Sequence, residues 1–295
     1  MQKKTVYLHI GYHKTGTSFL QNEIFPKYSS VNFIRSKNIL KQLRKIREEK
    51  LTEKDIDYIK RAFSTQLKKR KNLISWEALC GSYFWNNFDK DSLTILEDLY
   101  AIFSNIYIKI ILGMREQVSL ITSLYKLYLH IGGVKSEYEF IDNLNLDKFK
   151  FTNYISALDS YFGFDNVYIY YFENFVKDKK TFLRNLVEFL GENEIPEYDD
   201  VIKNRGYGEL QVKLAKILNP CFKSRFNPNG IDYRKRIPRG DPIPRKILQN
   251  KLSYTLHYKK YRFPPDIRKK LKNFYIEDNK RLKEKYLPSL PSEYI

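Results

Sequence analysis

The stretch Gly11-Tyr12-His13-Lys14-Thr15-Gly16-Thr17-Ser18-Phe19-Leu20 joins a short apolar run at residues 5–10 to a helical pattern over residues 17–25. A strand, a tight loop with glycines and a helix N-terminus aim several backbone N–H groups at one point. Proteins hold phosphate-like anions in this way. The sequence therefore predicts an anion-binding loop near the start of the chain.

The lysine of this loop does not stand where nucleotide-triphosphate loops place it. Their pattern is Gly-x-x-x-x-Gly-Lys-Ser/Thr, and Gly11, Gly16 and Ser18 keep three of its places. Thr17 occupies the lysine place, and Lys14 lies inside the loop. A nucleotide kinase needs a lysine directly after Gly16 and a Walker-type magnesium ligand, so Thr17 disfavours an ATPase or a kinase.

Strand and helix patterns alternate through the first two thirds of the chain. Runs rich in β-branched and aromatic residues cover residues 5–10, 31–34, 72–76, 106–113 and 167–172. Helical periodicity covers residues 17–25, 38–70, 116–131 and 179–190. Strands separated by helices predict an α/β fold, a P-loop-type three-layer sandwich with a central parallel sheet of about five strands. Ligands of such sheets bind at the carboxyl ends of the strands, where the loop lies.

A second pair of polar residues follows the predicted strand 106–113. Arg115 stands at the carboxyl end of this strand, and Ser123 follows eight residues later in the next helical pattern. Eight residues are about two helical turns. An arginine fork and a hydroxyl at this spacing can bind a second phosphate.

With these two motifs, the chain resembles the sulfotransferases that use 3′-phosphoadenosine 5′-phosphosulfate (PAPS), in particular the bacterial and carbohydrate-type members. The family loop Gly-x-x-Lys-Thr-Gly-Thr-Ser/Thr-x-Leu matches residues 11–20, and the family's arginine and serine for the 3′-phosphate match Arg115 and Ser123. The resemblance implies one sulfotransferase domain over residues 1–295. Its parts would be a nucleotide-binding core (5–205), basic proline-rich loops over the acceptor site (206–265) and a C-terminal helix (266–287).

The resemblance also implies roles for individual residues, with PAPS as co-substrate, adenosine 3′,5′-bisphosphate (PAP) as product and no metal. Lys14 and the loop N–H groups would stabilise the negative charge that develops on the leaving oxygen. Arg205 either joins Arg115 at the 3′-phosphate or is a surface arginine of a basic region. The expected nucleotide contacts are His13, Lys14, Thr15, Gly16, Thr17, Ser18, Arg115, Ser123 and Arg205.

An acceptor hydroxyl needs a base to take its proton. The resemblance points to Glu77, which follows the third predicted strand, although Trp76 stands where related bacterial chains often have serine. An exposed carboxylate that caps a helix is the alternative for Glu77. His13 is the competing base, or it contacts only the sulfate. His9 alternates into the buried face of its strand and is expected to be a core histidine.

Composition restricts the function without naming the acceptor. The net charge is +19, and residues 203–295 carry 24 Lys and Arg against 8 Asp and Glu, hence 24 − 8 = +16. We expect a cytoplasmic protein without a transmembrane segment. The expected acceptor is a glycan or glycolipid, and the basic C-terminal third would suit an acidic saccharide. A non-catalytic relative that binds PAP or PAPS and a basic nucleic-acid-binding protein are the alternatives; no recognised motif favours nucleic acid.

Overall fold

A computed structural model describes residues 4–35, 37, 39–81, 90–200, 206–232, 248 and 259–295. The chain divides into two compact units. The first unit comprises Met1–Glu116, Asp147–Val201 and Tyr275–Ile295, and the second comprises Gln117–Leu146 and Ile202–Phe274. Helix α13 (Pro265–Lys285) contributes residues to both. The single sulfotransferase domain expected from the sequence stays a prediction.

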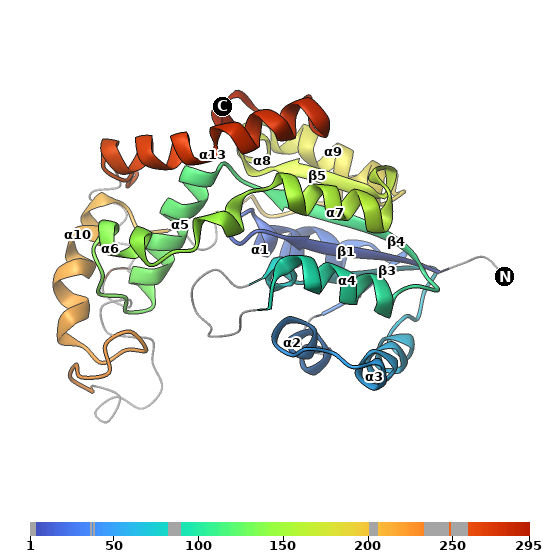
Figure 1. Cartoon of the computed structure of the whole chain (residues 1–295). Coiled ribbons are helices and arrows are strands. Elements are labelled where there is room, and N and C mark those ends of the chain that lie inside the picture. Colours follow the sequence, from blue (N-terminus) through green and yellow to red (C-terminus); the bar gives the residue numbers. More distant parts are fainter. Residues whose placement is uncertain are drawn as a thin grey trace. The chain divides into compact units, whose positions relative to one another are not determined.

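The first unit is built on a five-stranded sheet in which all strands are parallel (Figure 1). The strand order is β2-β3-β1-β4-β5. Crossovers between parallel strands need long connections, and helices supply most of them here. The predicted α/β fold class is therefore confirmed. The strands are β1 (Thr5–Gly11), β2 (Val31–Ile34), β3 (Lys71–Ser75), β4 (Tyr107–Met114) and β5 (Val167–Tyr171).

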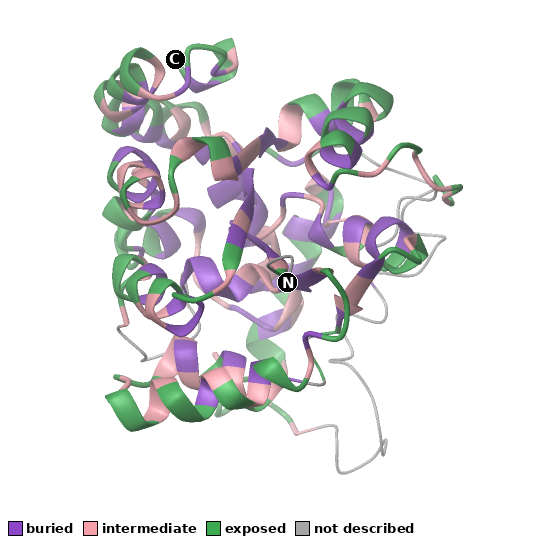
Figure 2. Cartoon of the chain, turned by 90° about the vertical axis from the view of Figure 1, so that its right-hand side faces the viewer, coloured by how far each residue is buried: buried purple, intermediate pink, exposed green. Residues whose placement is uncertain are grey.

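Helices cover both faces of this sheet, so its strands carry apolar side chains on both sides. One face packs on α1 (Thr17–Phe19), α8 (Phe172–Lys177) and α9 (Lys179–Phe189) in a single apolar cluster. On the other face lie α4 (Ser92–Ile102) and α7 (Thr152–Phe162), as Figure 1 shows. Buried residues, purple in Figure 2, concentrate on the strands and on the inner sides of these helices. Neither α4 nor α7 was predicted from the sequence.

The prediction of one or two charged helices over residues 38–70 is confirmed as two helices, whereas the helix predicted over residues 17–25 differs from the structure in detail. The pattern over residues 38–70 forms α2 (Leu40–Glu48) and α3 (Glu53–Ser64), because Thr52 begins a new helix with a capping box. The Thr52 hydroxyl accepts from the Asp55 N–H at 3.3 Å, and Asp55 Oδ2 accepts from the Thr52 N–H at 3.0 Å. After α1, the chain continues as a π-helical turn, Leu20–Ile24, and a 3-10 turn, Phe25–Lys27.

The second unit contains α5 (Gln117–His130), α6 (Glu137–Asp142), α10 (Glu209–Leu218) and the first half of α13. Tyr125 is fully buried, and its ring centroid lies 5.2 Å from that of Phe140 and 5.6 Å from that of Phe263. Loops were predicted for residues 206–265, and α10 corrects this for residues 209–218, which hold no proline. No helix within the described ranges is long and apolar enough to span a bilayer.

Candidate functional site

The loop after β1 rests directly on the neighbouring strand β4. Gly11 and Gly113 are partners in the β1–β4 register, and the Tyr12 N–H donates to Gly113 O at 3.1 Å. A Cβ at Gly11 would lie 2.7 Å from the Gly113 nitrogen, and Gly11 has a φ of 152°. Only glycine permits this approach. The glycine that opens the sequence motif therefore sets the path of the loop.

Two residues with a left-handed backbone conformation then turn the loop toward the helix. Lys14 has a φ of 69°, and Gly16 has a φ of 92° at the start of α1. A left-handed non-glycine residue costs about 1–3 kcal/mol, so the surrounding structure must hold it. Arg115 Nη1 donates a hydrogen bond to Lys14 O at 2.9 Å. The second motif of the sequence thus fixes the backbone of the first.

The side chain of Lys14 is largely buried, and burial lowers the pKa of its ammonium group. The negative charge of Glu77 opposes this effect, whereas the positive charge of Arg115 adds to it. A second negative group at the loop would favour the charged form of Lys14. The site therefore holds a partly desolvated cation whose charge an anionic ligand would stabilise.

Glu77 joins the loop from the end of β3. The Trp76 N–H donates to His9 O at 2.9 Å, which extends the β1–β3 pairing and brings the next residue to the loop. His13 Nδ1 lies 3.3 Å from Glu77 Oε1, with 34% of the Glu77 side chain exposed. Burial raises the pKa of Glu77, but His13, Thr17 and Lys14 together lower it below the ordinary value. Glu77 is consequently a carboxylate at neutral pH.

Arg115 is buried at the carboxyl end of β4, and its guanidinium lies over the Phe172 ring at 4.3 Å from the centroid. Burial lowers the pKa of Arg115, and the nearby carboxylate of Glu173 counteracts this. Glu173 accepts hydrogen bonds from the Glu116 N–H at 3.1 Å and from the Tyr294 hydroxyl at 3.3 Å. Arg115 is therefore a buried cation whose charge the neighbouring Glu173 partly balances.

The structure brings five candidate residues together in the first unit: His13, Lys14, Thr17, Glu77 and Arg115. The remaining candidates have other positions. Thr15 is buried in the same loop, Gly16 begins α1 and Ser18 is exposed on α1; Ser123 is buried on α5 in the second unit, and Arg205 lies outside the described residues.

His9 is a buried core histidine, as the sequence predicts. Its Nδ1 lies 2.7 Å from Ser75 Oγ and its Nε2 lies 3.1 Å from the Tyr170 hydroxyl. Burial lowers the pKa of His9 to about 4. Tyr170, Ser75 and Gln21 were not predicted as site residues. Their types and spacing carry no signal, because strand register brings Ser75 and Tyr170 to His9, and Gln21 reaches Ser75 from the π-helical turn after α1.

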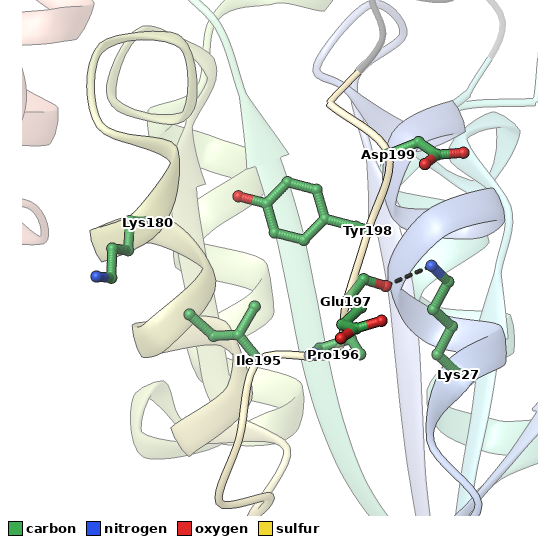
Figure 3. Close-up of a pocket in the computed structure, with 7 residues that line it drawn as sticks. All are labelled: Lys27, Lys180, Ile195, Pro196, Glu197, Tyr198 and Asp199. Carbon is green, nitrogen blue, oxygen red and sulfur yellow. Dashed lines mark hydrogen bonds between the residues drawn. The ribbon is translucent and has the colours of Figure 1, made fainter.

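A surface hollow of about 620 Å³ is lined by Lys27, by Lys180 of α9 and by residues 195–199 (Figure 3). The Lys27 ammonium donates to Glu197 O across it, and the ring of Tyr198 packs edge-on against Phe19 at 5.4 Å. None of the predicted site residues that the structure describes lines this hollow. Within the described ranges, no group of three or more His, Cys, Asp and Glu side chains is placed to hold a metal ion.

A five-stranded parallel sheet that carries a glycine-bounded loop after its central strand defines a P-loop-like α/β protein. Among solved structures, the chain is similar to a sulfotransferase from Alicyclobacillus acidocaldarius. The TM-score is 0.57 at 13% sequence identity, and the match covers 98% of this chain and 97% of that one. The chain therefore has the fold of a sulfotransferase, as the resemblance of its motifs implies.

Two further solved structures match with lower TM-scores. Mouse sulfotransferase SULT7A1 complexed with PAP matches with a TM-score of 0.46 and 13% identity, covering 97% of this chain and 90% of that one. A sulfotransferase domain from the curacin biosynthetic pathway matches with a TM-score of 0.45 and 14% identity, covering 88% of this chain and 100% of that one. No family model matches the chain, and the curated proteins contain no match either.

Proposed function

We propose that this protein is a sulfotransferase that moves the sulfuryl group of PAPS to a hydroxyl or amine of an acceptor. The observation that carries the proposal is the arrangement around the loop. Lys14 and the His13–Glu77 pair come together at the carboxyl edge of the sheet, and Arg115 holds the Lys14 backbone. The sulfotransferase fold supports the same reading.

The residues of the loop fit a phosphosulfate better than a triphosphate. Gly16 begins α1 without a side-chain cap, which leaves the first N–H groups of the helix to face a ligand. Lys14 adds a positive charge that burial has stripped of much of its water. In a loose sulfuryl-transfer transition state, charge gathers on the leaving phosphate oxygen, by analogy with phosphoryl transfer. Lys14 would stabilise that charge as the S–O bond breaks.

Glu77 is the base we propose for the acceptor. A hydroxyl that attacks sulfur must lose its proton, and the carboxylate of Glu77 can take it. His13 then orients Glu77 through the 3.3 Å contact between Nδ1 and Oε1. His13 as the base, with Glu77 orienting its ring, is the alternative that the same contact allows. Comparing Glu77→Gln with His13→Asn separates the two.

A carbohydrate or glycolipid is the acceptor class that we propose. The support is the resemblance to carbohydrate-type members and the positive charge of the C-terminal third, which an acidic saccharide would neutralise. Ser123 and Arg205 are proposed as further contacts of the 3′-phosphate, together with Arg115. The proposal includes no metal ion, because the donor has no β,γ-phosphate chain that needs one.

The test is transfer of ³⁵S from labelled PAPS to a panel of glycans, glycolipids, small phenols and lipids. We expect label on at least one saccharide acceptor, with PAP released in equal amount. Binding of PAP without label on any acceptor would favour the non-catalytic relative. Lack of PAP binding, with DNA affinity that falls steeply with salt, would replace the proposal with nucleic-acid binding.

A further inference from the structure

A row of buried polar side chains runs beneath the loop, across strands β3, β1 and β5. It begins at Gln21, whose amide nitrogen lies 3.3 Å from Ser75 O and 2.9 Å from Ser75 Oγ. A backbone carbonyl can only accept a hydrogen bond. The NH₂ end of Gln21 therefore faces Ser75, and the Ser75 hydroxyl accepts from it.

The Ser75 hydroxyl can then direct its own proton at His9. Ser75 Oγ lies 2.7 Å from His9 Nδ1, and a serine proton directed at Nδ1 requires the histidine proton to be on Nε2. Burial keeps His9 neutral by lowering its pKa to about 4. A neutral imidazole has one donor and one acceptor nitrogen. His9 Nε2, 3.1 Å from the Tyr170 hydroxyl oxygen, thus donates to Tyr170.

The Tyr170 hydroxyl is hydrogen-bonded to the hydroxyls of Thr15 and Thr17 in the loop. Thr15 Oγ1 donates to Tyr12 O at 2.7 Å, so it has a free lone pair for Tyr170. A Cβ at Gly113 would lie 2.5 Å from the Tyr170 hydroxyl and 2.7 Å from Thr15 Oγ1, so both hydroxyls crowd over this glycine. Thr17 Oγ1 lies 3.5 Å from Thr15 Oγ1, and the Thr17 hydroxyl is hydrogen-bonded to Glu77.

We propose that these groups form one directional hydrogen-bond chain that positions the base. The order of donation is Gln21, Ser75, His9, Tyr170, Thr17 and Glu77, and Thr15 is a side branch whose own proton goes to Tyr12 O. His9 and Tyr170 are positioning residues: they fix the Thr17 hydroxyl so that it donates its hydrogen bond to the Glu77 carboxylate. Since every bond in the chain depends on its neighbour's orientation, breaking one reorients the rest. Only the activity part of this inference rests on the proposed function.

The direct test is the tautomer of His9, read from the ¹⁵N shifts of the imidazole in ¹⁵N-histidine-labelled protein. His9→Gln identifies the signal among the four histidines. We expect an Nε2–H tautomer with an unprotonated Nδ1 at pH 7. Ser75→Ala or Gln21→Met should convert it to a mixture of tautomers. A pure Nδ1–H tautomer or an imidazolium in the wild type would overturn the proposal.

The second test compares Tyr170→Phe with Tyr168→Phe. The two tyrosines are two residues apart on β5, and their ring centroids are 6.4 Å apart. Tyr168 does not belong to the proposed hydrogen-bond chain. We expect Tyr170→Phe to raise the pKa of the Glu77 carboxyl, followed by ¹³C NMR, and to lower kcat about three- to tenfold with little change in PAP affinity. Tyr168→Phe should leave both unchanged. Equal effects of the two substitutions, or an unchanged Glu77, would contradict the chain.

The readouts separate this inference from the proposed function. The His9 tautomer and the Glu77 titration need no acceptor and no transfer reaction. If the wild-type protein transfers no sulfuryl group but both spectroscopic results hold, the chain stands and the proposed function fails. If transfer is normal and Tyr170→Phe keeps full kcat with an unshifted Glu77, the proposed function stands and the chain is refuted.

Discussion

The two cations at the loop of the first unit have surroundings opposite to those of three lysines in the second unit. In the first unit, Lys14 is largely buried and Arg115 is buried. In the second unit, the side chains of Lys213, Lys259 and Lys270 are 68%, 84% and 61% exposed, and each lies near a carboxylate. Exposed ion pairs contribute little energy because water screens them. A high net charge therefore marks no site by itself, whereas a desolvated lysine beside a strained loop does.

The strongest contrast is expected between Lys14→Met and Lys213→Met. The first substitution removes a cation that stabilises developing charge, so turnover should fall about 10²–10³-fold. PAP affinity should fall less, because the loop N–H groups and Arg115 remain. Lys213→Met removes an exposed charge and should leave turnover within about twofold, since surface substitutions change little. Steady-state kinetics with PAPS and binding calorimetry with PAP measure both; near-normal turnover in Lys14→Met breaks the comparison.

The next effect concerns the base. Glu77→Gln should lower kcat about 10²-fold, within the usual contribution of a general base. His13→Asn should lower it less if His13 only orients Glu77. PAP binding should be close to wild type in both variants, which shows that the loop is intact. A larger loss in His13→Asn than in Glu77→Gln would assign the proton transfer to the histidine.

The pH range of activity should extend further on the acid side, and less far on the alkaline side, than the pKa values of a free glutamate and a free lysine would give. The pKa of Glu77 is lowered, so the carboxylate persists to lower pH than in a free glutamate, and activity falls only below that point. The pKa of Lys14 is lowered mainly by burial, so its charge is lost at lower pH than in a free lysine. The alkaline limb should vanish in Lys14→Arg, in which the charge does not titrate. An unchanged alkaline limb would assign it to another group.

In the second unit, the carboxylate of Glu137 should affect stability and not chemistry. It accepts from Lys216 Nζ at 2.7 Å and from the Tyr261 hydroxyl at 2.8 Å. Glu137→Gln should cost about 1–3 kcal/mol of unfolding free energy. Burial raises the pKa of Glu137, but Lys216 and Tyr261 hold it below the ordinary value. Its contribution is therefore present above the unfolded pKa and is lost as the pH falls through the folded pKa. Urea unfolding at pH 7 and pH 3 measures this.

The Glu137→Gln variant should still bind PAP with wild-type affinity at pH 7. Lys270→Gln is the matched control, because Lys270 Nζ lies 3.3 Å from Asp142 Oδ1 in an exposed pair. It should change the unfolding free energy by less than about 0.5 kcal/mol. A loss of PAP affinity in Glu137→Gln at full folding would mean that this region reaches the nucleotide.

The sequence predicted the sheet well because each strand is a short apolar run between helical patterns. The loop was predictable for the same reason: Gly11, Lys14 and Gly16 lie within six residues, so a local motif contains most of its geometry. Glu77 was predicted from the family resemblance together with its position after a strand, since the carboxyl ends of parallel strands meet at one edge.

The rest of the site depends on strand order, which the sequence does not reveal. Tyr170 reaches the loop because β5 pairs with β4, and His9 meets Ser75 because β1 pairs with β3. Nothing in the residue types separates Tyr170 from the other 23 tyrosines. The hydrogen bond from the Arg115 side chain to the Lys14 carbonyl was also not predicted, since the spacing of Arg115 and Ser123 suggested only a phosphate contact.

The most direct measurement of the central claim is calorimetric titration with PAP and, separately, with ATP and magnesium. The displaced lysine predicts that PAP binds without a metal, that Lys14→Met weakens this binding and that Arg115→Ala weakens it further. ATP with magnesium should give little heat. Tight, magnesium-dependent binding of ATP with no binding of PAP would contradict the account.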